Sequence, residues 1–162
     1  MSRLDSAIRR LLAQRACLDR AIELAAAVPG PAIELGLGNG RTYDHLRRHM
    51  PDREIFVFER AVMAHPDSCP DDAHLILGDL RRTLPSALAR IGQPAALAHI
   101  DIGSGDLEAT AVTAAFIAEA LPTLLAPGAA VVSDQPLTLP TAESLDLPDG
   151  VTPGRYFLYR SR

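Results

Sequence analysis

Lysine is absent from this sequence of 162 residues, so all 16 of its Lys-or-Arg positions are arginine. Without a lysine amine, Schiff-base catalysis of the pyridoxal type is excluded. A Walker-type phosphate loop also requires lysine after its glycines, so P-loop nucleotide enzymes are excluded as well. The absence of one residue type therefore removes two large classes of enzyme.

Cysteines and long hydrophobic runs are also scarce. The two cysteines, Cys17 and Cys69, have no C-x-x-C spacing, which excludes a zinc or disulfide framework and is typical of a reducing compartment. No apolar run approaches the ~20 residues of a membrane helix. The first helix carries Asp5, Arg9 and Arg10 where a signal peptide needs apolar residues. We therefore expect a cytoplasmic protein without a membrane partner.

Charge limits the possible partners of the protein, and length limits the number of its domains. The net charge is −4, and the arginine pairs are dispersed among acids, so we expect no nucleic-acid partner. At 162 residues and 48% hydrophobic content, the chain is long enough for one domain and too short for two. We predict a single domain over 1–162, in which an N-terminal helix (1–28) precedes a ligand-binding core (31–133) and a closing loop with an edge strand (134–162).

Helical periodicity from Ser2 to Val28 predicts one long amphipathic helix that ends at Pro29-Gly30-Pro31. The helix packs on the sheet, covers the ligand as a lid, or forms a contact between two copies of the chain; these alternatives stay open. Short β-rich and helical runs then alternate, which predicts a doubly wound α/β fold with a mostly parallel sheet. The predicted strands are Ala32–Leu35, Glu54–Phe58, His74–Leu77, Ala98–Ile102 and Ala129–Val132, and the predicted helices are Arg41–Met50, Ser86–Ile91 and Leu107–Leu125.

Two segments depart from this alternation. Pro66 and Pro70 leave at most a short helix between the second and third strands. The proline-rich stretch from 135 to 153 predicts a long loop with one short helical turn near Ala142–Leu145, and Arg155–Tyr159 predicts an edge strand. The C-terminal part is therefore expected to be short, leaving the ligand site open or closed by a second subunit.

A glycine-rich turn follows the first strand. Glu34 ends an apolar run, and Gly36, Gly38 and Gly40 follow at every second position. Such a turn lets a nucleotide approach the backbone closely. The dinucleotide fingerprint requires its third glycine where Arg41 stands, so the spacing argues against NAD.

Acidic residues follow the predicted strands, at the edge where parallel sheets bind ligands. Glu59 lies 19 residues beyond Gly40, a separation that favours contact with the ribose hydroxyls of a nucleotide. Gly78, Asp79 and Leu80 offer a carboxylate and an apolar side chain for adenine. An N-cap role is the alternative for Asp79.

Taken together, these motifs resemble the class I S-adenosylmethionine-dependent methyltransferases over Pro31 to about Ser133. The resemblance implies a Rossmann-like methyltransferase fold and S-adenosyl-L-methionine as cofactor. It implies that Gly36, Gly38 and Gly40 contact the methionine part, Glu59 the ribose and Asp79 the adenine. Glu34 and Asp101 are also expected among the cofactor-binding residues. Acid-rich strand ends suit this cofactor, which is a sulfonium without phosphates.

The sequence motifs say less about the residues that bind the methyl acceptor. Asp101, which follows the fourth strand, is a candidate catalytic residue. His99, two residues earlier on the same strand face, is the candidate general base. The Asn/Asp-Pro-Pro-aromatic signature of enzymes that methylate amino groups of bases is absent. Asp101, Asp134 and Gln135 are similar to the metal ligands of cation-dependent O-methyltransferases, which suggests Mg²⁺ as a hypothesis.

We therefore predict an enzyme that methylates a small-molecule acceptor, with oxygen as the favoured acceptor atom. Positioning the acceptor in line with the S–CH₃ bond is the expected catalytic device. Two alternatives stay open: a methyltransferase-like binding module without turnover, and a nicotinamide-dependent enzyme.

Overall fold

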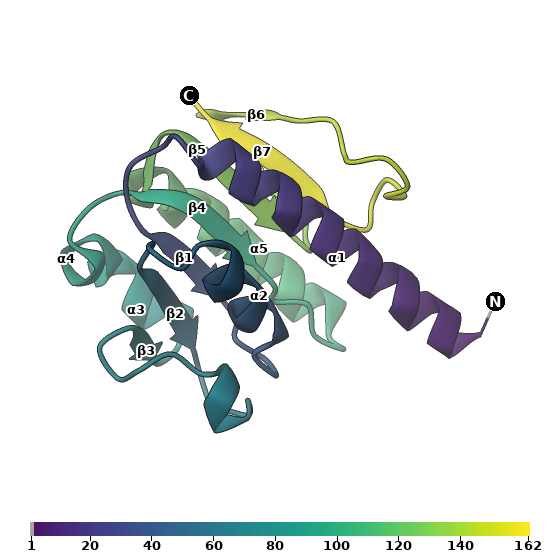
Figure 1. Cartoon of the computed structure of the whole chain (residues 1–162), viewed down its shortest axis with the longest axis horizontal. Helices are drawn as coiled ribbons and strands as arrows, with labels where there is room; N and C mark the ends of the chain where they lie inside the picture. The colour runs from purple at the N-terminus through teal and green to yellow at the C-terminus, as the bar shows by residue number, and fades with distance from the viewer. Residues whose placement is uncertain (1) are drawn as a thin grey trace.

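The computed structural model describes residues 2–162, which form a seven-stranded sheet covered by helices on both faces (Figure 1). The strand order is β3-β2-β1-β4-β5-β7-β6. Strands β1 to β5 run parallel, β7 is antiparallel to β5, and β6 is antiparallel to β7. The strands are β1 (Ala32–Leu35), β2 (Ile55–Glu59), β3 (Leu75–Leu77), β4 (Ala95–Ile100), β5 (Leu125–Ser133), β6 (Ala142–Ser144) and β7 (Phe157–Ser161).

The helices form two layers that enclose the sheet (Figure 1). Helices α1 and α2 share one buried cluster with one face of the sheet, and α4 and α5 share a second cluster with the other face. This arrangement confirms the predicted doubly wound α/β fold. The helical elements are α1 (Arg3–Ala25), α2 (Arg41–His49), η1 (Pro66–Ser68), α3 (Leu80–Thr83), η2 (Leu84–Ser86), α4 (Ala87–Ile91), α5 (Leu107–Ala120) and η3 (Leu121–Leu124).

Helix α1 begins where the sequence predicted. The Ser2 side chain accepts from the Asp5 backbone N–H, and the Asp5 carboxylate accepts from the Ser2 N–H, which forms a capping box. The C-terminal half of α1 is buried against the sheet, and its N-terminal half extends beyond it (Figure 1). Leu4 is 68% and Leu12 50% exposed, which leaves apolar surface on this half of the helix. A contact with a second copy through this surface stays a prediction.

The structure corrects the prediction for the C-terminal segment. Ala142–Ser144 forms strand β6 instead of a helical turn, because its backbone pairs with the free edge of β7. Strand β7 itself lies inside the sheet, between β5 and β6, and is therefore not an edge strand. The fourth strand also starts and ends earlier than Ala98–Ile102, which puts Asp101 directly after it.

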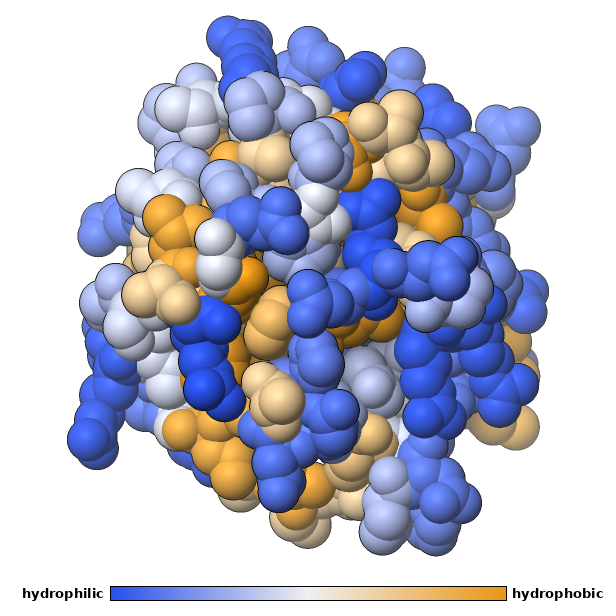
Figure 2. Space-filling model, turned by 60° about the vertical axis from the view of Figure 1, so that its left-hand side comes forward, coloured by the Kyte–Doolittle hydropathy of each residue, from blue (hydrophilic) through white to orange (hydrophobic). Residues whose placement is uncertain are grey.

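Helix α5 and the turn that follows it are strongly apolar. Among residues 2–162, the window Leu107–Leu124 is the one helical segment long and apolar enough to cross a membrane by length and composition, although the sequence analysis found no such run. A third of this window (33%) is buried in the protein, where Ala114, Ile117 and Leu121 pack on the sheet. Figure 2 shows another view of the surface, on which hydrophilic residues predominate and hydrophobic ones form smaller areas between them.

Candidate active site

A cleft of about 370 Å³ lies at the carboxyl ends of β1 to β4. Its size falls in the range of small-molecule sites. A larger hollow of about 610 Å³ lies at the other end of the strands and contains none of the predicted site residues. The 370 Å³ cleft brings together seven of the nine residues predicted to bind the cofactor: Gly36, Gly38, Glu59, Gly78, Asp79, Leu80 and Asp101.

Two of the three turn glycines are required by close backbone contacts. Gly36 has a φ of +95°, and a Cβ atom there would lie 2.3 Å from the carbonyl oxygen of Asp101. Gly40 has a φ of +79° at the N-cap of α2, and its Cβ would lie 2.2 Å from the carbonyl oxygen of Ser68. Gly40 does not line the cleft, so its place in the structure explains a role in the turn and not a ligand contact.

Glu59 holds the glycine turn against the end of β2. One carboxylate oxygen accepts from the N–H groups of Leu37 (2.8 Å) and Gly38 (3.1 Å), and the other accepts from those of Arg60 (2.6 Å) and Ala61 (3.2 Å). Burial works to raise the pKa of Glu59, but these four donors together hold it below its ordinary value. A contact with ribose hydroxyls requires the ribose to replace some of these donors.

Asp79 caps the short helix α3. Its carboxylate accepts from the backbone N–H of Arg81 at 2.8 Å, which is the alternative role that the sequence analysis left open. Asp79 also lines the cleft together with Leu80, so contact with an adenine ring stays a prediction.

Glu34 and His99 are fully buried in the middle of the sheet, one on β1 and one on the neighbouring β4. His99 Nδ1 lies 3.0 Å from Glu34 Oε1, which also accepts from the Thr42 hydroxyl of α2. Neither residue lines the cleft. The prediction that His99 acts as a general base, and that Glu34 contacts the cofactor, therefore lacks a geometric basis: both side chains belong to a buried polar cluster.

Asp101 stands at the border between the cleft and α1. Its carboxylate accepts a 2.8 Å hydrogen bond from the amide of Gln14, a residue of α1 that is only 5% exposed. Sequence analysis did not identify Gln14. The available signal was its position beside Ala13, Cys17 and Leu18 on the buried side of the helix, where a polar residue needs a partner.

Asp134 lies beneath the loop that follows β4. Its carboxylate accepts from the N–H groups of Ile102 (3.2 Å) and Gly103 (2.7 Å) and from the Gln135 amide (3.2 Å). Burial, followed by the nearby charge of Asp101, raises the pKa of Asp134 despite these donors. Burial and the same two carboxylates also raise the pKa of Tyr156, a buried residue that sequence analysis missed.

This geometry does not support the Mg²⁺ hypothesis. Both oxygens of Asp134 already accept hydrogen bonds, and the amide nitrogen of Gln135 points to Asp134. Among residues 2–162, the group of His, Cys, Asp and Glu side chains close enough to hold a metal is a different one, Asp19 with His45 and His49.

The cleft does fit the predicted S-adenosyl-L-methionine. Gly38 lines the cleft and has no atom within 4 Å of its Cβ position, which leaves its backbone open to a ligand, and Glu59, Asp79 and Asp101 supply carboxylates for a cationic ligand. Arg60 and Arg81 also lie along the cleft.

Comparisons with known proteins agree with the predicted family and cofactor. Residues 1–161 match a family model described as S-adenosyl-L-methionine methyltransferase. The crystal structure of an S-adenosyl-L-methionine methyl transferase from Silicibacter pomeroyi DSS-3 is 49% identical, covers 100% of this chain and 99% of its own, and has a TM-score of 0.93. Among curated proteins, no sequence matches this chain.

More distant structures share the fold alone. Human methyltransferase-like protein 13, solved in complex with SAH, is 14% identical with a TM-score of 0.55, over 98% of this chain and 80% of that protein. An O-methyltransferase family protein from Burkholderia thailandensis is 14% identical with a TM-score of 0.53, over 98% of this chain and 58% of that protein.

Proposed function

The chain belongs to the S-adenosyl-L-methionine methyltransferase family, and from this premise we propose that it methylates an oxygen atom of a small-molecule acceptor beside Asp101. The protein is an enzyme that uses S-adenosyl-L-methionine. The observation that carries the proposal is the position of Asp101, which lines the cleft and is held from behind by Gln14. The cleft, with Gly38, Glu59 and Asp79 in its lining, would hold the cofactor, which would supply the methyl group, and the acceptor would approach from the side of Asp101.

A second carboxylate favours oxygen over nitrogen as the acceptor atom. Asp134 lies close enough to Asp101 for the charge of Asp101 to raise its pKa. An amine in the cleft beside Asp101, with Asp134 behind it, would be favoured in its protonated form, which has no lone pair for attack. A hydroxyl group instead donates its proton to a carboxylate as it becomes a nucleophile.

The reaction then balances without a metal ion. The acceptor oxygen uses a lone pair to form a bond to the methyl carbon as the S–CH₃ bond breaks. The electron pair of the S–CH₃ bond stays on sulfur. The hydroxyl proton passes to the carboxylate of Asp101. Gln14 holds that carboxylate in place, and the glycine turn fixes the cofactor so that the transfer is in line.

A matched acceptor panel tests the proposal. Pairs of small alcohols or phenols and the corresponding amines are incubated with the enzyme, and release of the demethylated cofactor is measured. We expect turnover with hydroxyl acceptors, and a loss of about 100-fold in kcat for Asp101→Asn with cofactor affinity retained.

Asp52→Asn, an exposed change at the opposite end of the sheet, is the control. Turnover confined to amines would overturn the choice of oxygen. An Asp101→Asn enzyme as active as the wild type would overturn the role of Asp101.

A further inference from the structure

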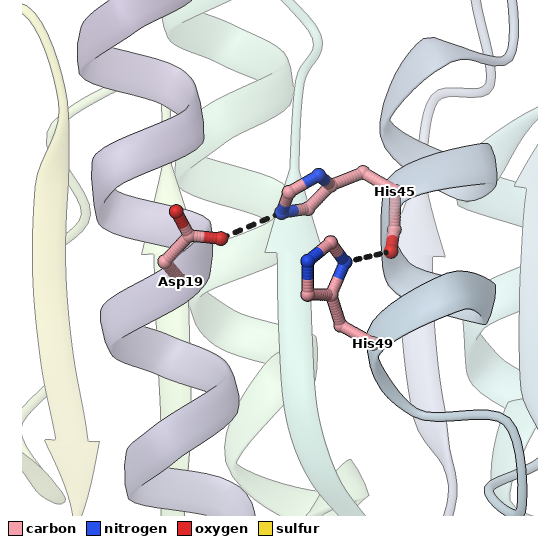
Figure 3. Close-up of side chains that lie close together, drawn as sticks. All are labelled: Asp19, His45 and His49. Atoms are coloured by element: carbon pink, nitrogen blue, oxygen red, sulfur yellow. Dashed lines mark hydrogen bonds and ion pairs between the residues drawn. The ribbon is translucent and has the colours of Figure 1, made fainter.

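Helices α1 and α2 bring two histidines and an aspartate together on the sheet face that both helices cover (Figure 3). Asp19 comes from α1, and His45 and His49 come from α2. One ligand atom from each of the three side chains lies within 4.8 Å of the others. None of the three residues lines the methyltransferase cleft.

The two histidines have the spacing that is typical of metal-binding histidine pairs on a helix. They are four residues apart, so both project from the same side of α2, and their ring centroids are 4.1 Å apart. The Nδ1 atom of His49 lies 2.8 Å from the carbonyl oxygen of His45. A carbonyl can only accept, so Nδ1 carries the proton and Nε2 of the neutral ring is left with a free lone pair.

The third side chain already faces the first histidine. Asp19 Oδ1 lies 2.7 Å from Nε2 of His45, as the dashed line in Figure 3 marks. A metal ion bound by these two atoms would take the place of the proton that they share, and both side chains would serve as its ligands. The side chain of His45 is 20% exposed, so it is held in place by its surroundings, and Asp19 and His49 are exposed and able to adjust.

We propose that Asp19, His45 and His49 bind one divalent ion of the zinc class, with water as a further ligand. Imidazole nitrogen together with carboxylate oxygen is a donor set that suits zinc better than magnesium. Zinc bonds of about 2.0–2.2 Å in a tetrahedron set the ligand atoms about 3.4 Å apart. Asp19 Oδ1 and His45 Nε2, now 2.7 Å apart, would therefore separate slightly, and small rotations of the exposed Asp19 and His49 side chains bring the three ligand atoms to this spacing.

Binding would join α1 to α2. Asp19 lies five residues after Gln14 on α1, which is about 7.5 Å along a helix axis. The ion would therefore fix the helix whose Gln14 supports Asp101, and would also fix α2, which starts at the glycine turn. We infer a stabilising metal site that is separate from the methyl-transfer site.

Zinc titration of the tag-free protein tests this inference without cofactor or acceptor. We expect about one ion per chain by calorimetry, and a Zn²⁺-dependent rise in the thermal unfolding midpoint. His49→Ala should bind at least about tenfold more weakly, because it removes a ligand. His49 is exposed, so its removal leaves the core intact, and the metal-free unfolding midpoint of the variant verifies this.

The matched control is His65→Ala, which removes an exposed histidine outside the cluster and should leave zinc affinity unchanged. Equal zinc affinity of His49→Ala and wild type would overturn the proposal. So would the absence of zinc binding by the wild type, or binding lost on Cys69→Ser and retained in His49→Ala.

Discussion

The side-chain amide of Gln14 donates a 2.8 Å hydrogen bond to the carboxylate of Asp101, across 87 residues of sequence. The bond joins the N-terminal helix to the carboxyl end of β4, at the border of the cleft. Because Gln14 is buried, the bond links the packing of α1 directly to the position of the candidate catalytic carboxylate.

Replacing Gln14 with leucine should therefore destabilise the protein despite the similar size of the two side chains. Asp101 loses its buried donor, and such a loss costs about 1–3 kcal/mol. Denaturant unfolding of Gln14→Leu measures this cost. The control is Gln93→Leu at an exposed position, and equal losses in the two variants would contradict the assigned role of Gln14.

Glu59→Gln should weaken the binding of S-adenosyl-L-methionine by about tenfold to 100-fold, because hydrogen bonds to a charged group contribute about 1.5–3 kcal/mol each. The variant loses the charge and one of the two carboxylate oxygens that together accept from four backbone N–H groups. Calorimetric titration measures the affinity, with NAD as a ligand that we expect not to bind. Glu143→Gln, on the distant strand β6, should bind as the wild type does.

The same residue should make stability depend on pH in a defined direction. The pKa of Glu59 is lowered in the folded protein from its ordinary value of 4.5. Its contribution to stability is therefore fully present above pH 4.5 and is lost as the pH falls through the lower, folded pKa. Wild type should exceed Glu59→Gln in free energy of unfolding at neutral pH, and this difference should shrink in acid. A difference that grows in acid would contradict the assignment.

Gly36→Ala should unfold at a lower temperature and lose cofactor binding. Alanine at a φ of +95° is strained, and its Cβ would lie 2.3 Å from the carbonyl oxygen of Asp101, so the turn must move. Gly105→Ala is the matched control, because no atom lies within 4 Å of a Cβ there. Thermal unfolding and calorimetry together measure both effects, and similar behaviour of the two variants would contradict the close-contact argument.

Asp101→Asn should become relatively more stable as the pH rises. Burial and the charge of Asp101 raise the pKa of Asp134, so the folded state holds the Asp134 proton more tightly than the unfolded state does. Wild type therefore loses stability as the pH rises from 3.8 through the raised pKa. Asparagine removes the charge, so this loss should be smaller in the variant. Unfolding curves measured across this range test the expectation, which fails if both proteins show the same pH dependence.

His99→Gln should reduce stability far more than it reduces cofactor affinity. His99 is fully buried against Glu34, and leaving a buried polar group without its hydrogen-bond partner costs about 1–3 kcal/mol. Glutamine removes the ring but leaves the cleft lining unchanged. Chemical denaturation and calorimetry separate the two effects. An intact unfolding midpoint with abolished methyl transfer would restore the general-base role for His99.

Sequence alone determined the fold class and identified seven of the residues that line the cleft as candidates for cofactor binding. The alternation of strands and helices predicted the doubly wound sheet, and the acids and glycines at strand ends predicted Gly36, Glu59 and Asp101 at one edge of it. This works because parallel strands place their carboxyl ends at the same edge, so local patterns carry spatial information. The absence of lysine excluded competing chemistries by composition alone.

Only the tertiary structure decided which polar residues face the cleft and which are buried. Glu34 and His99 obey the same strand pattern as the cleft residues, but α1 and α2 cover their face of the sheet. Gln14 reaches Asp101 because α1 packs on the sheet beside β4, and Asp19 reaches His45 because α1 and α2 lie side by side. Strand β6 forms for the same kind of reason: the free edge of β7 supplies hydrogen-bond partners that local propensity does not specify.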